Sequence, residues 1–185
     1  FYSTGQRCTA SSRLIVSAEI HERFVKRLIE RMESLIVDHA LKPGTQMGPV
    51  VDDKQFEQDL NYIEVGCSEG AEMVTGGARL ERDTDGYYLA PTLFIETNNA
   101  MRINQEEMFG PIASVIRAHD YEEALTVAND TDFGLSAGIC TTSLKHASHF
   151  KRNSGAGMVM VNLPTAGVDY HVPFGGRRNS SFGPR

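Results

Sequence analysis

The sequence lacks the features that would place it in a membrane or on nucleic acid. No apolar run approaches the length of about 18 residues that a membrane span needs. The first residues lack the charged and apolar regions of a secretory signal peptide. Eighteen lysines and arginines stand against 24 aspartates and glutamates, a formal charge of −6, and no basic stripe is present. We therefore expect a globular protein that binds neither a membrane nor nucleic acid.

Cysteine is scarce, and its spacing excludes two common structural uses. The three cysteines, Cys8, Cys67 and Cys140, are an odd number, widely separated, with no CxxC pair and no Cys/His cluster. A disulfide framework and a zinc site are both disfavoured, so a reducing cytoplasm is the expected location and no metal is expected. Hydrophobic residues make up 41% of the 185 positions, which is enough for a domain with a real core.

Strand and helix patterns alternate along the chain. Short β-branched runs indicate strands, and apolar residues at i, i+4 and i+7 indicate helices. Asp120 and Glu123 form a capping-box pattern, and Pro91 suggests an edge or a bend in its strand. The alternation predicts an α/β fold with a largely parallel open sheet and flanking helices. Strands are expected over 13–17, 72–75, 89–95, 112–116, 135–141 and 158–161, and helices over 19–36, 52–69, 120–127 and 144–151.

Neither end of the chain resembles the end of an independent domain. The chain does not begin with Met, and residues 172–185 are rich in Gly, Pro, Ser and Arg without apolar periodicity. Such a loop has nothing to hold it against a core. We expect both ends to be cut points within a longer protein.

Cys8 is the first candidate for chemistry. Most cysteines behave as small hydrophobic residues, and that interpretation applies here too. The surroundings favour a reactive thiol, because Gly5 permits close approach of the backbone to a ligand and Arg7 can stabilise a thiolate. Cys67 and Cys140 follow helix and strand patterns and are interpreted as structural.

Two further segments are candidates for ligand binding. Glu106 and Glu107 precede Phe109; a carboxylate accepts two hydrogen bonds from a ribose diol, and an aromatic ring can cover a flat ligand. A solvated acidic pair is the alternative. Phe174 precedes two glycines and forms either the wall of a pocket or an ordinary turn. The histidines His146, His149 and His171 have no partner implied by the sequence and are assigned to the surface or to a pocket lining.

The order of these motifs resembles the catalytic half of the NAD(P)-dependent aldehyde dehydrogenases. Each motif alone is weak, but their succession covers the whole chain. They occupy residues 5–8 (GQRC), 48–49 (GP), 86–92 (GYYLAPT), 106–111 (EEMFGP), 128–129 (AN), 133–138 (FGLSAG), 157–162 (GMVMVN) and 173–176 (PFGG).

The resemblance implies a role for each candidate. Cys8 would be the nucleophile that adds to an aldehyde, giving a thiohemiacetal, then a thioester that water hydrolyses. Glu107 would hold the nicotinamide ribose and Phe109 would lie beside the nicotinamide. Arg7, Thr9, Val168 and Phe174 are the expected substrate-pocket residues, and the cofactor is NAD or NADP.

The resemblance also implies missing parts. Residues 1–185 correspond to the catalytic domain, whereas the general base, the second oxyanion donor, the cofactor-binding domain and the oligomerisation strand belong to the rest of such a subunit. We expect the isolated chain to be inactive and the full-length subunit to be a homo-oligomer. Alternatives are a CoA-acylating relative, a non-catalytic descendant of the fold and, less readily, a Cys–His hydrolase.

The expected substrate is a small aldehyde. Residues 162–174 and 177–185 are similar to the family branch that oxidises α-ketoglutaric semialdehyde (2,5-dioxopentanoate) in bacterial catabolism. Arg178 and the pair Ser180 and Ser181 depart from the usual Lys and Ser-Gly of the family. A substrate carboxylate would need a cation, for which Arg7 is a candidate; a surface or salt-bridging arginine is the alternative.

Overall fold

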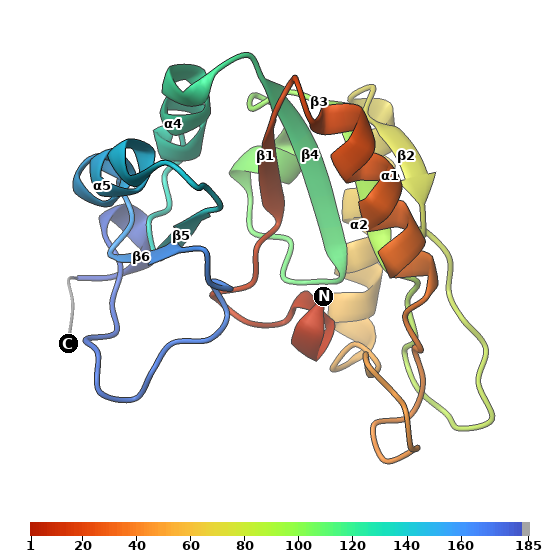
Figure 1. Cartoon of the computed structure of the whole chain (residues 1–185). Helices are drawn as coiled ribbons and strands as arrows, with labels where there is room; N and C mark the ends of the chain where they lie inside the picture. Colours follow the sequence, from red (N-terminus) through yellow and green to blue (C-terminus); the bar gives the residue numbers. More distant parts are fainter. Residues whose placement is uncertain (183–185) are drawn as a thin grey trace. The chain divides into compact units, whose positions relative to one another are not determined.

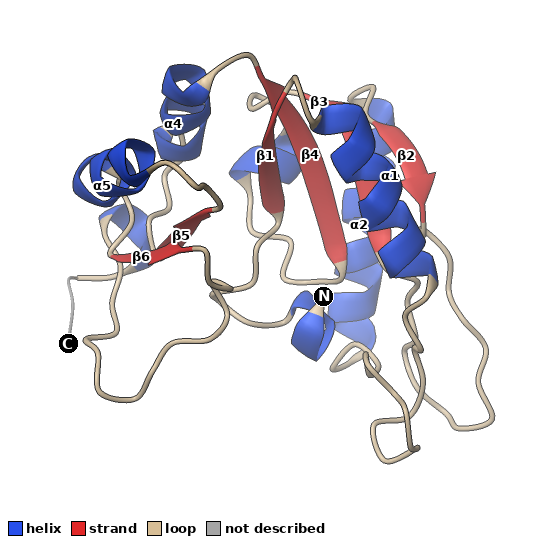
Figure 2. Cartoon of the chain, in the orientation of Figure 1, coloured by secondary structure: helices blue, strands red, loops and turns tan. Residues whose placement is uncertain are grey.

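The computed structural model describes residues 1–182 and divides the chain into two compact units, Phe1–Arg117 and Ala118–Arg185. Each unit combines helices and strands, as Figures 1 and 2 show. No helix within residues 1–182 is both long enough and apolar enough to cross a membrane. The predicted α/β fold is confirmed, but its strands form two separate sheets, one of four strands and one of two, rather than a single open sheet.

The first unit is built on a four-stranded sheet in the order β1-β4-β3-β2. Strand β3 pairs parallel with β4 and antiparallel with β2. The two inner strands are buried along most of their length, as expected for strands covered on both faces. The strands span Arg13–Ser17 (β1), Glu72–Thr75 (β2), Thr92–Thr97 (β3) and Ile112–Ala118 (β4).

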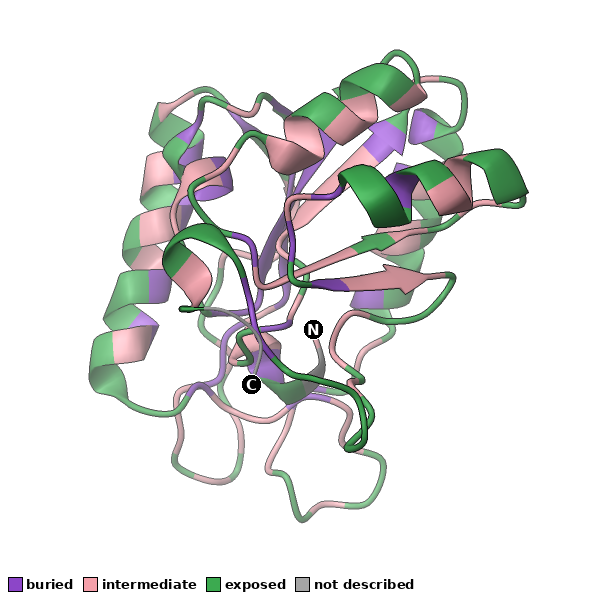
Figure 3. Cartoon of the chain, turned by 90° about the vertical axis from the view of Figure 1, so that its left-hand side faces the viewer, coloured by how far each residue is buried: buried purple, intermediate pink, exposed green. Residues whose placement is uncertain are grey.

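Helices α1 (His21–Glu33) and α2 (Asp53–Ser68) cover opposite faces of this sheet (Figure 1). Successive residues of a strand point to opposite faces. Accordingly, Leu93 packs with Val25 and Met32 of α1 in one hydrophobic cluster. Its neighbour Phe94 packs with residues of α2 in another cluster. In Figure 3 the helices carry buried residues at intervals with exposed residues between them, the pattern of amphipathic helices.

The element boundaries follow the sequence patterns closely, but the interpretation of Pro91 was wrong. Helix α2 begins where expected because the Asp52 side chain accepts a hydrogen bond from the Gln55 amide, 2.9 Å away. Pro91 marks neither an edge nor a bend of its strand: β3 is an inner strand that starts at Thr92, so the proline lies outside the ladder and no hydrogen bond is lost. The short helix α3 (Arg102–Gln105) has no apolar periodicity and was not predicted.

The second unit pairs β5 (Ser136–Ile139) parallel with β6 (Met158–Val161) through the crossover helix α5 (Leu144–Asn153). Helix α4 (Tyr121–Asn129) packs against α5. The Asp120 carboxylate accepts a hydrogen bond from the Glu123 amide, as the capping pattern predicts. The Glu123 carboxylate accepts from the His119 amide instead of that of Asp120. Residues Arg178–Ser180 form a single 3₁₀ turn.

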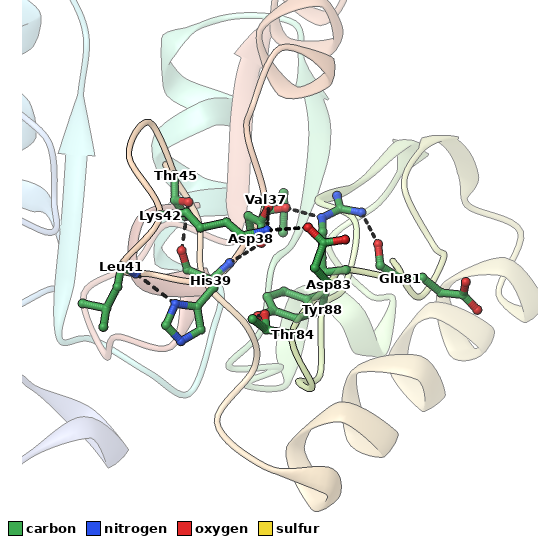
Figure 4. Close-up of polar contacts among 11 residues, drawn as sticks. Val37, Asp38, His39, Leu41, Lys42, Thr45, Glu81, Asp83, Thr84 and Tyr88 are labelled. Carbon is green, nitrogen blue, oxygen red and sulfur yellow. Dashed lines mark hydrogen bonds and ion pairs between the residues drawn. The ribbon is translucent and has the colours of Figure 1, made fainter.

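Two loops of the first unit, residues 37–47 and 80–88, are joined by polar contacts (Figure 4). Arg82 Nε donates to the Val37 carbonyl oxygen at 2.6 Å, and Lys42 Nζ lies 3.0 Å from carboxylate oxygens of both Asp38 and Asp83. Beneath them, Val37, Met47 and Tyr88 form a small hydrophobic cluster against which Phe1 packs. The joined loops therefore hold the start of the chain, and with it the segment that carries Cys8.

Candidate active site

Cys8 lies in an exposed turn that we call the cysteine loop, Gly5–Thr9. The Ala10 amide donates to the Arg7 carbonyl oxygen at 2.9 Å and closes the turn. Arg7 is exposed like Cys8, whereas Thr9 is only 6% exposed. The thiol is thus presented to solvent by a turn whose next residue is anchored in the protein.

Backbone strain accumulates just before the cysteine. Ser3, Thr4 and Gly5 have left-handed φ angles of 54°, 58° and 70°. Such a conformation is costly for a β-branched residue such as Thr4 and persists only where the surroundings impose it. The Thr4 hydroxyl donates to the Gly48 carbonyl oxygen at 3.1 Å, and Gln6 Oε1 accepts from the Val51 amide at 2.9 Å. Strain held by specific hydrogen bonds is typical of functional loops.

The second half of the site is the acidic loop, Glu106–Gly110, in which the two carboxylates have different surroundings. Arg102 binds Glu106 with two hydrogen bonds of 2.8 and 3.0 Å, and Tyr62 donates a third at 3.0 Å. The Arg102 guanidinium lowers the pKa of Glu106. The neighbouring Glu107 is exposed. Glu106 therefore holds the loop, while Glu107 presents an accessible carboxylate.

Helix α2 supports the acidic loop from below. The side-chain amides of Gln55 and Gln58 both donate to the Met108 carbonyl oxygen, at 3.0 and 3.1 Å. Met108 is 2% exposed, whereas Phe109 is 36% exposed and has a left-handed φ of 59°. Burial of Met108 between two exposed residues presents both Glu107 and Phe109 at the surface.

The two loops meet where Gly5 packs against Gly110. A β-carbon on Gly5 would approach the Gly110 carbonyl oxygen far more closely than the 3.0 Å that side chains require. Only glycine permits this contact, and Gly5 also has the positive φ that glycine favours. The contact places the loop that carries Cys8 directly against the loop that carries Glu107 and Phe109, residues about a hundred positions away in the sequence.

Asp59 lies beneath this junction, and the sequence analysis did not identify it as a site residue. It is fully buried, and its Oδ1 accepts a hydrogen bond from Gln55 Nε2 at 2.9 Å. Burial raises the pKa of Asp59 to about 6, and the hydrogen bond from Gln55 opposes that increase. The single available signal was an acidic residue within an apolar helix stripe, at position 59 between Phe56 and Ile63.

We expect Asp59→Asn to change how the stability of the chain depends on pH. Between pH 4 and 6 the folded state keeps a proton that the unfolded state, with a pKa of about 3.9, has already released. Protonated Asp59 therefore makes its full contribution to the free energy of unfolding below pH 4. This contribution is lost as the pH rises through about 6. Relative to wild type, the variant should gain about 2.5 kcal/mol in free energy of unfolding between pH 4 and pH 8. Urea unfolding at both pH values measures the difference, and equal differences at the two would contradict it.

The remaining predicted site residues, Val168 and Phe174, lie in the second unit, in the loop that follows β6. Val168 is half-buried and Phe174 is exposed. The two glycines after Phe174 serve packing: a β-carbon on Gly157 would overlap the Gly175 carbonyl oxygen, and Gly176 lies against residues 134 and 135. Only Arg7 and Thr9 among the predicted substrate residues share a unit with Cys8.

Some residues set aside in the sequence have clear partners. His146 stacks on Tyr121 with ring centroids 4.2 Å apart, and the Tyr121 hydroxyl lies 2.9 Å from His149 Nδ1. His171 pairs with Asp169 at 3.1 Å. The sequence did not imply these partners, because they are distant in sequence or lie within a loop. His149 and His171 are exposed and His146 is half-buried, in keeping with their assignment to the surface. Cys67 and Cys140 are exposed, as Cys8 is, so exposure alone does not distinguish the three thiols.

Comparison with known proteins confirms the resemblance. All of residues 1–185 match the aldehyde dehydrogenase family. The chain is 43% identical to the α-ketoglutaric semialdehyde dehydrogenase of Bacillus subtilis over 183 residues, covering 98% of this chain and 38% of the relative. It is also 43% identical to the 2,5-dioxopentanoate dehydrogenase of Saccharolobus solfataricus over 183 residues, covering 97% of this chain and 37% of that protein.

The fold gives the same result. The crystal structure of a betaine aldehyde dehydrogenase from Staphylococcus aureus in complex with NAD⁺ superposes with a TM-score of 0.95 at 31% identity, covering 99% of this chain and 37% of that one. The chain thus spans a little over a third of the length of the relatives it matches. The chain belongs to the aldehyde dehydrogenase family.

Proposed function

We propose that these 185 residues are the catalytic segment of a longer NAD(P)-dependent aldehyde dehydrogenase, with Cys8 as the nucleophile. The observation that carries this proposal is the contact of Gly5 with Gly110, which sets the cysteine loop against the acidic loop. A non-catalytic descendant of the fold would have no need for an exposed thiol, an exposed carboxylate and an exposed aromatic ring around one strained junction.

The residues of the acidic loop fit a nicotinamide cofactor. The exposed Glu107 carboxylate can accept hydrogen bonds from both hydroxyls of a ribose, and exposed Phe109 offers a flat apolar surface. The absence of side chains at Gly5 and Gly110 lets the two loops pack directly against each other. When bound, the nicotinamide supplies the acceptor for a hydride. Glu106 and the two glutamines keep the loop in place.

Cys8 performs the covalent chemistry. Its thiolate sulfur forms a bond to the aldehyde carbon, and the carbonyl oxygen becomes the oxyanion of a tetrahedral thiohemiacetal. Loss of a hydride from that carbon leaves a thioester on Cys8. Water then adds to the thioester carbon, the C–S bond breaks, and the carboxylic acid and the thiol are released. The turn that exposes Cys8 leaves its sulfur accessible to substrate.

α-Ketoglutaric semialdehyde is the substrate that we propose. Two relatives at 43% identity carry names for the oxidation of this compound. The compound bears a carboxylate, and a guanidinium binds carboxylates with two parallel hydrogen bonds. Arg7 places an exposed guanidinium next to Cys8 in the chain.

The test is an assay of the full-length protein that contains this chain. We expect NAD(P)H formation with α-ketoglutaric semialdehyde at a kcat/KM at least about tenfold above that with betaine aldehyde, a cationic aldehyde that Arg7 would repel. The released product should be the free acid. Aldehyde oxidation that requires CoA and yields an acyl-CoA in place of the free acid would favour the CoA-acylating alternative. Absence of oxidation with any aldehyde would favour the non-catalytic alternative. The 185-residue chain alone should produce no NAD(P)H.

A further inference from the structure

Asp59 is a buried carboxyl group that the chemistry of Cys8 does not use. It lies on α2 and is fully buried. Oδ1 accepts a hydrogen bond from Gln55, whereas Oδ2 has no hydrogen-bond partner among the described residues. Burying a carboxyl group with one oxygen unpaired is unfavourable. A helix stripe of this kind is ordinarily filled by an apolar residue, so the carboxyl group calls for another explanation than core packing.

The carboxyl group of Asp59 is packed directly against Gly110. A β-carbon on Gly110 would overlap the carboxyl carbon and both carboxyl oxygens, and these are the three nearest atoms it would meet. Gly110 does not have a left-handed φ. Glycine is therefore required at position 110 by the Asp59 side chain and not by the backbone conformation. Gly5 in turn packs against the Gly110 carbonyl oxygen.

Asp59 also reaches the acidic loop through Gln55. The same side-chain nitrogen of Gln55 donates to Asp59 Oδ1 at 2.9 Å and to the Met108 carbonyl oxygen at 3.0 Å. Fixing that amide between two acceptors fixes the position of Met108. Asp59 thus acts on the acidic loop at two points, residues 108 and 110, which flank the exposed Phe109.

We propose that Asp59 is a positioning residue that sets the acidic loop against the cysteine loop, acting through Gln55 and Gly110. It touches neither substrate nor cofactor. This inference rests on the proposed function, because it assigns to Asp59 the placement of Glu107 and Phe109 for cofactor binding. The carboxyl group provides both a rigid, flat contact for Gly110 and a hydrogen-bond acceptor for Gln55. An apolar side chain could fill the space but could not accept the hydrogen bond.

Substitution of Asp59 in the full-length protein tests the hydrogen-bonding part. Asp59→Ala should raise KM for the cofactor about tenfold, with the KM for the aldehyde changed less than about twofold. Asp59→Asn keeps the acceptor and the flat shape and should restore the cofactor KM to within about twofold of wild type. Ile63→Val, which removes a methyl group from the same buried stripe of α2, is the control and should leave both KM values unchanged.

A double substitution tests the contact with Gly110. Gly110→Ala should lower kcat/KM about 100-fold, because the new methyl group meets the Asp59 carboxyl group and displaces the loop. In Asp59→Ala/Gly110→Ala the methyl group occupies the space left by the carboxyl group. The double variant should have a kcat/KM at least about tenfold higher than that of Gly110→Ala, although each substitution alone lowers activity.

The outcomes separate this inference from the proposed function. A wild-type protein that oxidises no aldehyde overturns the proposed function, and the positioning role that rests on it. An active wild type in which Asp59→Ala leaves the cofactor KM unchanged, or alters it no differently from Asp59→Asn, overturns the positioning role alone. So does a double variant no more active than Gly110→Ala. Thermal unfolding of each variant shows that the comparison is made between folded proteins.

Discussion

Replacing Cys8 by serine is expected to lower the rate of aldehyde oxidation by the full-length protein about 10⁴-fold or more. Covalent catalysis needs a nucleophile that is ionised near neutral pH and that leaves readily from the acyl intermediate. A serine hydroxyl stays protonated near neutral pH, and its alkoxide is a poorer leaving group than a thiolate, so it satisfies neither requirement. Because Cys8 is exposed in a turn and fills no core position, the substitution should leave the melting temperature unchanged.

The chain contains matched controls for this substitution. Cys67 and Cys140 are exposed, like Cys8, so Cys67→Ser and Cys140→Ser should retain full activity. Mass spectrometry of wild type quenched during turnover should place the acyl group on Cys8, and Cys8→Ser should carry none. Retention of more than about a tenth of the wild-type rate by Cys8→Ser would reject Cys8 as the nucleophile.

The second large effect is expected from Gly5→Ala. Alanine at a left-handed φ of 70° costs about 1–2 kcal/mol, and forcing a methyl group against the Gly110 carbonyl oxygen costs about 1–3 kcal/mol more. We expect the free energy of unfolding of the chain to fall by about 2–5 kcal/mol, measured by urea denaturation. In the full-length protein, displacement of the cysteine loop should also lower kcat/KM by about 100-fold.

Gly70→Ala separates the two contributions to that loss. Gly70 has a φ of 90°, and a β-carbon there would meet no atom within 4 Å. The substitution introduces backbone strain without a steric clash. It should therefore lower the free energy of unfolding by only about 1–2 kcal/mol, the cost of the left-handed φ, and leave activity intact. If both substitutions destabilise the chain equally, the contact between Gly5 and Gly110 contributes nothing and the argument for a built junction fails.

Much of the fold was predictable because its elements have local causes. Strand β2, helix α2 and strand β6 follow from β-branched runs, apolar periodicity and the Asp52 cap, all of which operate within a few residues. The wrong interpretation of Pro91 has a non-local cause. Whether a strand lies at the edge depends on which other strands pair with it, and a proline before the first paired residue is compatible with either position.

The candidate site was predictable in its residue types and not in its construction. The succession of motifs singled out Cys8, Glu107 and Phe109 and assigned the family, which the comparisons confirm. It assigned Glu107 to the ribose and gave Glu106 no role of its own, whereas in the structure Arg102 and Tyr62 bind Glu106. It passed over Asp59, because one acidic residue in an amphipathic helix is indistinguishable from a solvated one until the burial of its face is known.

The sequence by itself determined the family and the alternation of strands and helices, and it predicted the thiol and the carboxylate as site residues, since each of these is encoded in contiguous residues. The tertiary structure decided which of them meet. Gly5, Asp59 and Gly110 come from a loop, a helix and a second loop that are far apart in the chain, and their contact exists only after the sheet has brought α2 and the acidic loop together. At that point Gly110 contacts both Gly5 and the buried carboxyl group of Asp59, and close packing leaves no room for a side chain on either glycine. This arrangement sets the loop that carries Cys8 against the acidic loop.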